Sequence, residues 1–214
     1  MPTRRTFLST SALGLAATLL PAAALSPEEE ISLHMFSKHL QFLNYDQMAE
    51  AARDMGFAGL DLTVRPGGHV APERVSEELP QAVAAMKKQG LRPHMMTTAL
   101  TEADESSATV LKEARKAGFS VYRSGWLSYP EHVPVPVSLE KYKGQLTALA
   151  ALSAESGMQG AYQNHTGNYL GAAIWDLWEV LKDLPPGTLG SQYDIRHATV
   201  EGGNAWYQNL RLIA

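Results

Sequence analysis

The chain contains no cysteine, which excludes disulfides, thiolate catalysis and zinc sites built on cysteine. It also lacks an excess of basic residues. Its 18 Lys and Arg residues stand against 22 Asp and Glu, giving a formal net charge of −4 and no indication of nucleic-acid binding. The apolar run at 11–20 is shorter than the ~20 residues of a membrane-spanning helix. What remains is ordinary globular usage, 45% hydrophobic and 19% charged over 214 residues, which is ample for a core.

The amino terminus has the pattern of an export signal. The stretch 3–8 carries the pair Arg4-Arg5, an Ala/Leu-rich run follows at 11–20, and a small-x-small site lies at 22–24. We interpret residues 1–24 as a cleaved Tat signal peptide; the alternative is a short membrane anchor. The interpretation predicts a periplasmic protein without stable membrane insertion after cleavage, whose domain covers 25–214.

Short apolar runs alternate with amphipathic segments from residue 31 onward. Four of the predicted helices end at a glycine just before the next strand, which is typical of helix-to-strand loops. The predicted strands are 31–36, 59–63, 91–97, 120–123, 158–163 and 189–194, and the predicted helices are 44–55, 80–89, 104–117, 139–156, 175–184 and 205–213.

Such alternation implies parallel strands with right-handed crossovers, in an open doubly wound sheet or a (β/α)8 barrel. No G-x-G-x-x-G follows the first strand, which weakens the nucleotide-binding open sheet. Polar residues gather at the predicted strand ends, as in barrels whose loops share one site. We therefore predict an α/β fold, a TIM barrel with about six of its eight units, truncated at its carboxyl end. Its unpaired edges make a homo-oligomer possible. The polar residues are His34, Asp61, Arg65, His94, Arg123, Gln163, Asn164, His165, Asp194 and His197.

One stretch, 191–203, pairs a carboxylate with an imidazole three residues later. A strand ending at Asp194 would place His197 on the loop beyond, so both side chains could point into the same end of the barrel. Carboxylate and neutral imidazole suit a divalent metal. The alternative is an Asp that caps the next turn beside a surface His.

Several motifs together resemble the xylose-isomerase-like TIM-barrel superfamily. They are 162–165 (YQNH) and 193–203 (YDIRHATVEGG), with Tyr122-Arg123 and Gly125-Trp126 upstream. That superfamily holds sugar (phosphate) isomerases and epimerases, inosose dehydratases and endonuclease-IV-type enzymes, and the resemblance covers residue 31 to the end.

The resemblance implies one divalent metal (Mn, Mg, Co or Zn) held by a Glu, an Asp, a His and a Glu after strands five to eight. The Asp falls on Asp194, and the Glu of the fifth strand falls on Gln163, a weaker ligand that cannot act as a base. The last two ligands have no position in this sequence. The histidine of the family's D-x-x-H motif falls on His197.

The resemblance thus implies an isomerase or epimerase of a small carbohydrate, with metal-assisted proton transfer through an enediolate, and the signal pattern predicts its export. Sequence identifies no catalytic base. The alternatives are a keto-sugar lyase or hydratase and a non-catalytic sugar-binding remnant. His34 and His94 are interpreted as core histidines. The predicted substrate-binding residues are His197, His165, Arg123, Asn164 and Trp126, and the predicted metal ligands are Asp194 and Gln163.

Overall fold

The computed structural model describes residues 31–214. The predicted signal peptide, 1–24, lies outside the described residues. Among the described helices, none combines the length and apolarity needed to cross a membrane.

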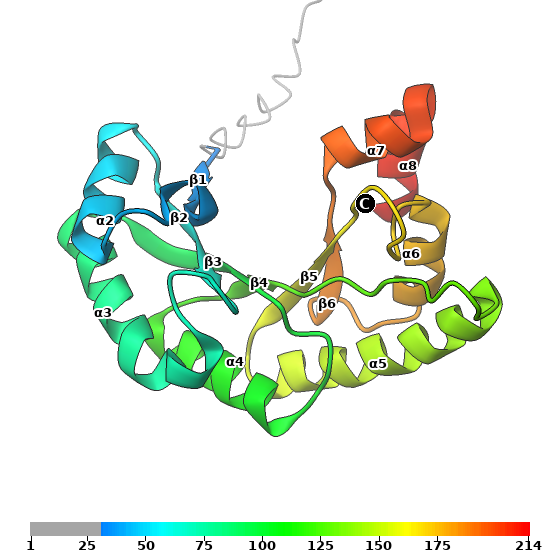
Figure 1. The fold of residues 1–214 in the computed structure, drawn as a ribbon, viewed down its shortest axis with the longest axis horizontal. Helices are drawn as coiled ribbons and strands as arrows, with labels where there is room; N and C mark the ends of the chain where they lie inside the picture. Colours follow the sequence, from blue (N-terminus) through cyan, green and yellow to red (C-terminus); the bar gives the residue numbers. More distant parts are fainter. Residues whose placement is uncertain (1–30) are drawn as a thin grey trace, which may run out of the picture. The chain divides into compact units, whose positions relative to one another are not determined.

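Six parallel strands form one sheet in which each strand pairs with the next in the chain (Figure 1). Within residues 31–214, the first and last strands each pair with one neighbour only, so the sheet is open. This confirms the predicted barrel with six units. The strands are β1 His34–Phe36, β2 Gly59–Val64, β3 Arg92–Thr98, β4 Val121–Arg123, β5 Gln159–Gln163 and β6 Leu189–Gln192.

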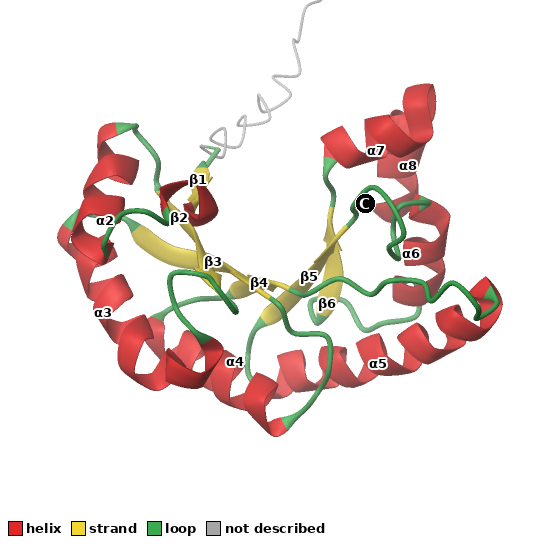
Figure 2. Ribbon diagram, viewed as in Figure 1, coloured by secondary structure: helices red, strands yellow, loops and turns green. Residues whose placement is uncertain are grey.

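Helices follow the strands in alternation and cover the outer side of the curving sheet (Figure 2). Within residues 31–214 there are also three short 3-10 helices, η1 Ser37–Leu40, η2 Pro72–Arg74 and η3 Gly203–Ala205. The α-helices are α2 Tyr45–Asp54, α3 Val75–Lys88, α4 Glu105–Ala117, α5 Val135–Glu155, α6 Ile174–Leu181, α7 Ile195–Gly202 and α8 Trp206–Ile213.

The core lies between the sheet and these helices. In β2, Leu60, Leu62 and Val64 are fully buried in the apolar core. Because side chains alternate along a strand, Asp61 and Thr63 point to the opposite, inner face. The same alternation on the other strands directs polar side chains to that inner face.

Local sequence sets most helix boundaries. Asn44 and Gln47 form a capping box at the start of α2, Asp104 caps α4 through the Ser107 amide, and Gly118 ends α4 in the left-handed region at φ 108°.

Three predictions need correction. Helix α3 begins at Val75, so Pro80 lies inside it rather than at its start. Helix α5 begins at Val135, directly after Pro134. The last strand ends at Gln192, and the unpredicted helix α7 follows it.

Candidate functional site

The candidate site lies where three neighbouring strands end. Arg123 and Gln163 are the last residues of β4 and β5, and Asp194 follows β6 by two residues. Arg123 Nη1 donates to Gln163 Oε1, and Gln163 Nε2 donates to Asp194 Oδ2 at 2.8 Å. The three side chains therefore form one hydrogen-bonded row at the carboxyl edge of the sheet.

Asp194 caps helix α7 and faces the site at the same time. Its Oδ1 accepts from the His197 amide at 3.0 Å. Asn164 fixes the Asp194 backbone on both sides: Asn164 Oδ1 accepts from Asp194 N at 2.6 Å, and Asn164 Nδ2 donates to Asp194 O at 3.0 Å. The capping role expected as the alternative is thus present, and Oδ2 still faces Gln163. The expectation that His197 lies on a loop is wrong, because the cap places it in the first turn of α7.

Two histidines stand beside this row. The His165 and His197 rings are 4.0 Å apart between centroids, and His197 Nε2 lies 3.8 Å from Asp194 Oδ2. His165 Nδ1 donates to Thr166 O at 2.8 Å, so in the neutral ring Nε2 is the acceptor. Burial lowers the pKa of His197, and Asp194 opposes that effect while His165 adds to it. The neutral form of the His197 imidazole is therefore favoured.

An aromatic wall borders the row. Trp126 Nε1 donates to Gln163 O at 3.1 Å, and the Trp126 ring lies 4.6 Å from the His165 ring and 5.9 Å from the Tyr169 ring. The loop that carries Trp126 is also held from the outer face of the sheet, because Tyr162 Oη accepts from Leu127 N at 2.9 Å.

Arg123, a member of the row, is a buried cation that lies against this aromatic wall. Its side chain is 5% exposed. Its guanidinium lies 4.6 Å from the Trp126 ring centroid and 5.6 Å from that of Phe36. Burial lowers the pKa of Arg123 to about 10, so it stays charged at neutral pH. Its buried Nε has no hydrogen-bond partner among the described residues.

Asp61, which the sequence placed in the strand-end group without a specific role, lies inside β2 on the inner face. The Thr97 hydroxyl lies within donating distance of both carboxylate oxygens, at 2.8 and 2.9 Å. Burial raises the pKa of Asp61 to about 6, against the opposing effects of Thr97 and Arg123. The available signal was an Asp inside the apolar strand Gly59–Val64.

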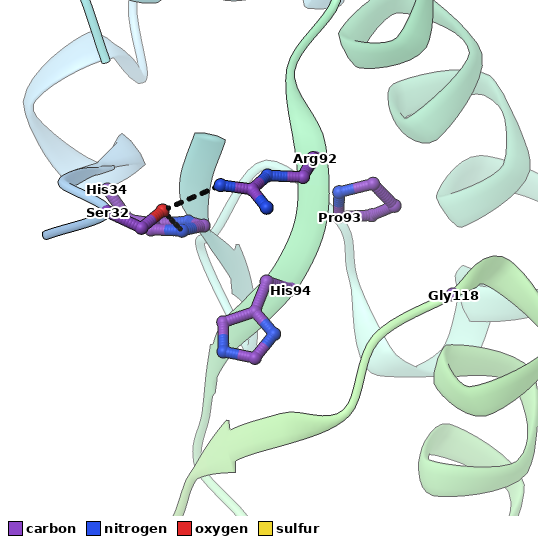
Figure 3. Close-up of a pocket in the computed structure, with 6 residues that line it drawn as sticks. All are labelled: Ser32, His34, Arg92, Pro93, His94 and Gly118. Atoms are coloured by element: carbon purple, nitrogen blue, oxygen red, sulfur yellow. Dashed lines mark hydrogen bonds between the residues drawn. The ribbon is translucent and has the colours of Figure 1, made fainter. Parts of the chain in front are cut away.

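Two predicted members of the strand-end group lie elsewhere. His34 begins β1 and His94 lies early in β3, so both are at the amino end of the sheet (Figure 3). Their placement at the carboxyl rim was wrong. The structure does bring together Arg123, Trp126, Gln163, Asn164, His165, Asp194 and His197.

The side chains present do not fit the divalent metal that the motifs imply. Within residues 31–214, no three His, Asp or Glu side chains form a potential metal cluster. Arg123 can only donate and the Asp194 carboxylate can only accept, so the Gln163 oxygen faces Arg123 and its amino group faces Asp194. Gln163 thus offers Asp194 an N–H group where a metal shell needs an oxygen.

Comparisons with known proteins bear on the fold. No family model and no curated protein matches the chain. Among solved structures, the probable 3-DHS dehydratase of petrobactin synthesis from Bacillus anthracis aligns with 86% of this chain and 70% of its own, at 14% identity and a TM-score of 0.68. A D-tagatose 3-epimerase-like protein aligns with 86% of this chain and 73% of its own, at 16% identity and a TM-score of 0.64.

The chain is a partial TIM barrel. A D-psicose 3-epimerase, crystallised in the presence of D-fructose, aligns at 12% identity and a TM-score of 0.58 over 81% of this chain. The partial barrel spans 66% of the length of that epimerase. Identities this low establish the shared fold, while activity and substrate are matters for proposal.

Proposed function

We propose that the rim formed by β4, β5 and β6 binds a sugar or keto-sugar. The observation that carries the proposal is the aromatic wall of Trp126 and His165 beside the row Arg123, Gln163 and Asp194. Ligand sites of small molecules combine apolar and aromatic walls with a few placed polar groups. A sugar ring offers both partners, because its C–H face packs on an aromatic ring while its hydroxyls donate and accept.

Each chain group has a role in this proposal. Asp194 Oδ2 accepts from a sugar hydroxyl, and the buried Arg123 orients the Gln163 amide beside it. His165 Nε2 accepts from a second hydroxyl, because Nδ1 is committed to Thr166 O. Asn164 is a positioning residue, since both of its amide groups hold the Asp194 backbone.

Binding of ketohexoses to the full chain tests the proposal, with calorimetry and Trp fluorescence as the readouts. Trp126→Ala should weaken binding by about tenfold. The reason is that packing of a sugar face on one aromatic ring contributes roughly 1 kcal/mol or more. Asp194→Asn keeps an acceptor for the α7 cap but removes the charge, and it should weaken binding as well.

The matched control is Trp175→Ala on α6, a Trp that is 63% exposed and outside the site. Binding that survives Trp126→Ala and Asp194→Asn unchanged, or no binding of any ketose, would contradict the proposal.

A second candidate is a metal-dependent sugar isomerase or epimerase, or a related keto-sugar lyase. Its support is the fold shared with proteins described as sugar 3-epimerases and as a dehydratase, together with the Asp194–His197 pair. The described side chains do not complete a metal shell, so this candidate requires ligands beyond residues 31–214 or from another chain.

Metal content separates the two candidates. The binding proposal predicts far less than one equivalent of metal per chain in the purified protein. A stoichiometric metal that disappears in Asp194→Ala would favour the enzyme instead. Gln163→Glu should raise affinity for Mn²⁺, because it restores a second carboxylate beside Asp194.

We also propose Tat export to the periplasm, supported by Arg4-Arg5 and the apolar run at 11–20. Changing Arg4 and Arg5 to Lys should leave the precursor in the cytoplasm, as fractionation and immunoblotting would measure. Unchanged periplasmic accumulation would contradict it.

A further inference from the structure

A polar cavity lies at the amino end of the sheet, away from the strand ends that form the proposed sugar site. Its volume is about 390 Å³. The lining consists of Ser32, His34, Arg92, Pro93, His94 and Gly118, without a carboxylate among them.

The polar members of this lining come from two neighbouring stretches of backbone. Figure 3 shows Arg92 and His94 projecting from β3 toward the side on which Ser32 and His34 lie, while Pro93 points the other way. Arg92 Nη2 donates to Ser32 Oγ at 3.1 Å, and Ser32 Oγ lies 3.1 Å from His34 Nε2. The His34 and His94 rings are 5.5 Å apart between centroids.

Positive charge here has no counterpart within the described residues. Arg92 forms no ion pair within residues 31–214. Among those residues, its side chain forms a hydrogen bond only with the neutral Ser32. Burial is the largest effect that lowers the pKa of His34, and the neighbouring His94 and Arg92 lower it further. A permanent cation, two imidazoles and a hydroxyl therefore face a cavity with no acid among the described residues that line it, in a protein that is acidic overall.

We infer that this cavity binds a phosphate group, as inorganic phosphate or as the phosphate end of a small monoester. A guanidinium donates in a fork to two phosphate oxygens, and charge-assisted bonds of this kind are the strong ones. Ser32 Oγ and the Nε2–H group of His94 supply donors to the remaining oxygens, since His94 Nδ1 is engaged by Ser120 Oγ at 2.8 Å. The anion would also remove the electrostatic reason for the lowered pKa of His34, so binding is coupled to proton uptake.

The inference is independent of the proposed sugar site, because the two sites lie at opposite ends of the parallel strands and share no residue. A sugar phosphate that bridges them is therefore not implied, and each site can fail without the other.

Calorimetry of the full chain with inorganic phosphate, at constant ionic strength set by chloride, tests the inference. One phosphate should bind per chain, and Arg92→Gln should weaken binding by at least about tenfold, as for loss of a charged hydrogen bond. Arg92→Lys should weaken it less, because the charge remains. Fructose 6-phosphate and fructose serve as a second pair of probes: equal affinity for phosphate and the monoester identifies free phosphate as the ligand, and tighter binding of the monoester identifies a phosphorylated molecule.

The matched control is Arg211→Gln, which removes an arginine of α8 that is outside the cavity. A histidine-detected NMR titration adds a positional readout: phosphate should shift the His34 and His94 signals and raise the pKa of His34, leaving His197 unchanged. Non-saturating heats, equal affinity in Arg92→Gln, or shifts confined to His165 and His197 would each overturn the inference.

Discussion

At the scale of single residues, the rim shows that a structural role and a site role coexist. Asp194 gives one carboxylate oxygen to the helix cap and the other to Gln163. The orientation of Gln163 is in turn set by a donor on one side and an acceptor on the other. Changing any one of the three residues therefore leaves its neighbours with an unsatisfied group, which is costly away from water.

Asp61 leads to a prediction on stability and pH. Its folded-state pKa of about 6 lies above the ordinary value of 3.8, so the native state holds the proton more tightly than the unfolded state does. The associated stability is present below about pH 4 and is lost as the pH rises through about 6, up to roughly 2–3 kcal/mol. Asp61→Asn keeps an acceptor for Thr97 and should therefore be more stable than the wild type at pH 8, but not at pH 4.

Urea denaturation at the two pH values measures that difference. Asp46→Asn, at an exposed position of α2, is the control for replacing a carboxylate by an amide. A stability difference between Asp61→Asn and the wild type that does not change with pH would contradict the prediction.

Sequence predicted Arg123, Gln163, Asn164 and Asp194 at one rim because all follow or end parallel strands. It failed for His34 and His94, because the first strand has three residues and the third contains an irregular pairing near its start. A histidine in such a short or irregular strand cannot be assigned to one end from periodicity alone.

At the scale of elements, the predictable boundaries were those with specific chemistry, such as the Asn44 box and Gly118. Helix α7 escaped prediction because its eight residues include β-branched Ile195, Thr199 and Val200, which have low helix propensity. It begins at the local Asp194 cap, and Asn164, 30 residues earlier in the chain, holds the Asp194 backbone. The contact with Asn164 cannot be read from local sequence.

Glycines on neighbouring strands allow a packing prediction. A Cβ at Gly160 of β5 would clash with Leu189 and lie 2.9 Å from Tyr122 Oη, and both groups are buried. Tyr122 cannot retreat without losing its 2.8 Å hydrogen bond to Ser153. Gly160→Ala should therefore destabilise the protein by about 1–3 kcal/mol.

Gly190→Ala on β6 is the matched control. No atom lies within 4 Å of its Cβ position, so we expect a change within ~0.5 kcal/mol. Thermal or urea unfolding compares the two variants; equal effects would show that the packing around Gly160 yields more readily than the contacts indicate.

At the scale of the whole molecule, the order of the sheet could be predicted because strands and helices alternate without interruption. The open edges could be predicted too, from the count of six strand-helix units, whereas what pairs with those edges could not. Within the described residues, β1 and β6 each leave one side of their backbone unpaired, and such edges recruit other strands.

We therefore expect concentration-dependent self-association, measurable by sedimentation velocity. Gly190→Lys should reduce it, because the β6 position has room for the side chain and a charge on an edge strand opposes pairing. Gly190→Ala should associate like the wild type. A wild-type chain that stays monomeric at every concentration would contradict this prediction.

The hydrogen bond between Tyr162 and the loop that carries Trp126 has a consequence for engineering. Tyr162 belongs to the outer layer, yet its hydroxyl fixes Leu127, one residue from the ring that borders the rim. Repacking beneath the helices at this point would thus be transmitted to the rim, so thermostabilising changes around Tyr162 and changes to the proposed sugar site cannot be pursued separately.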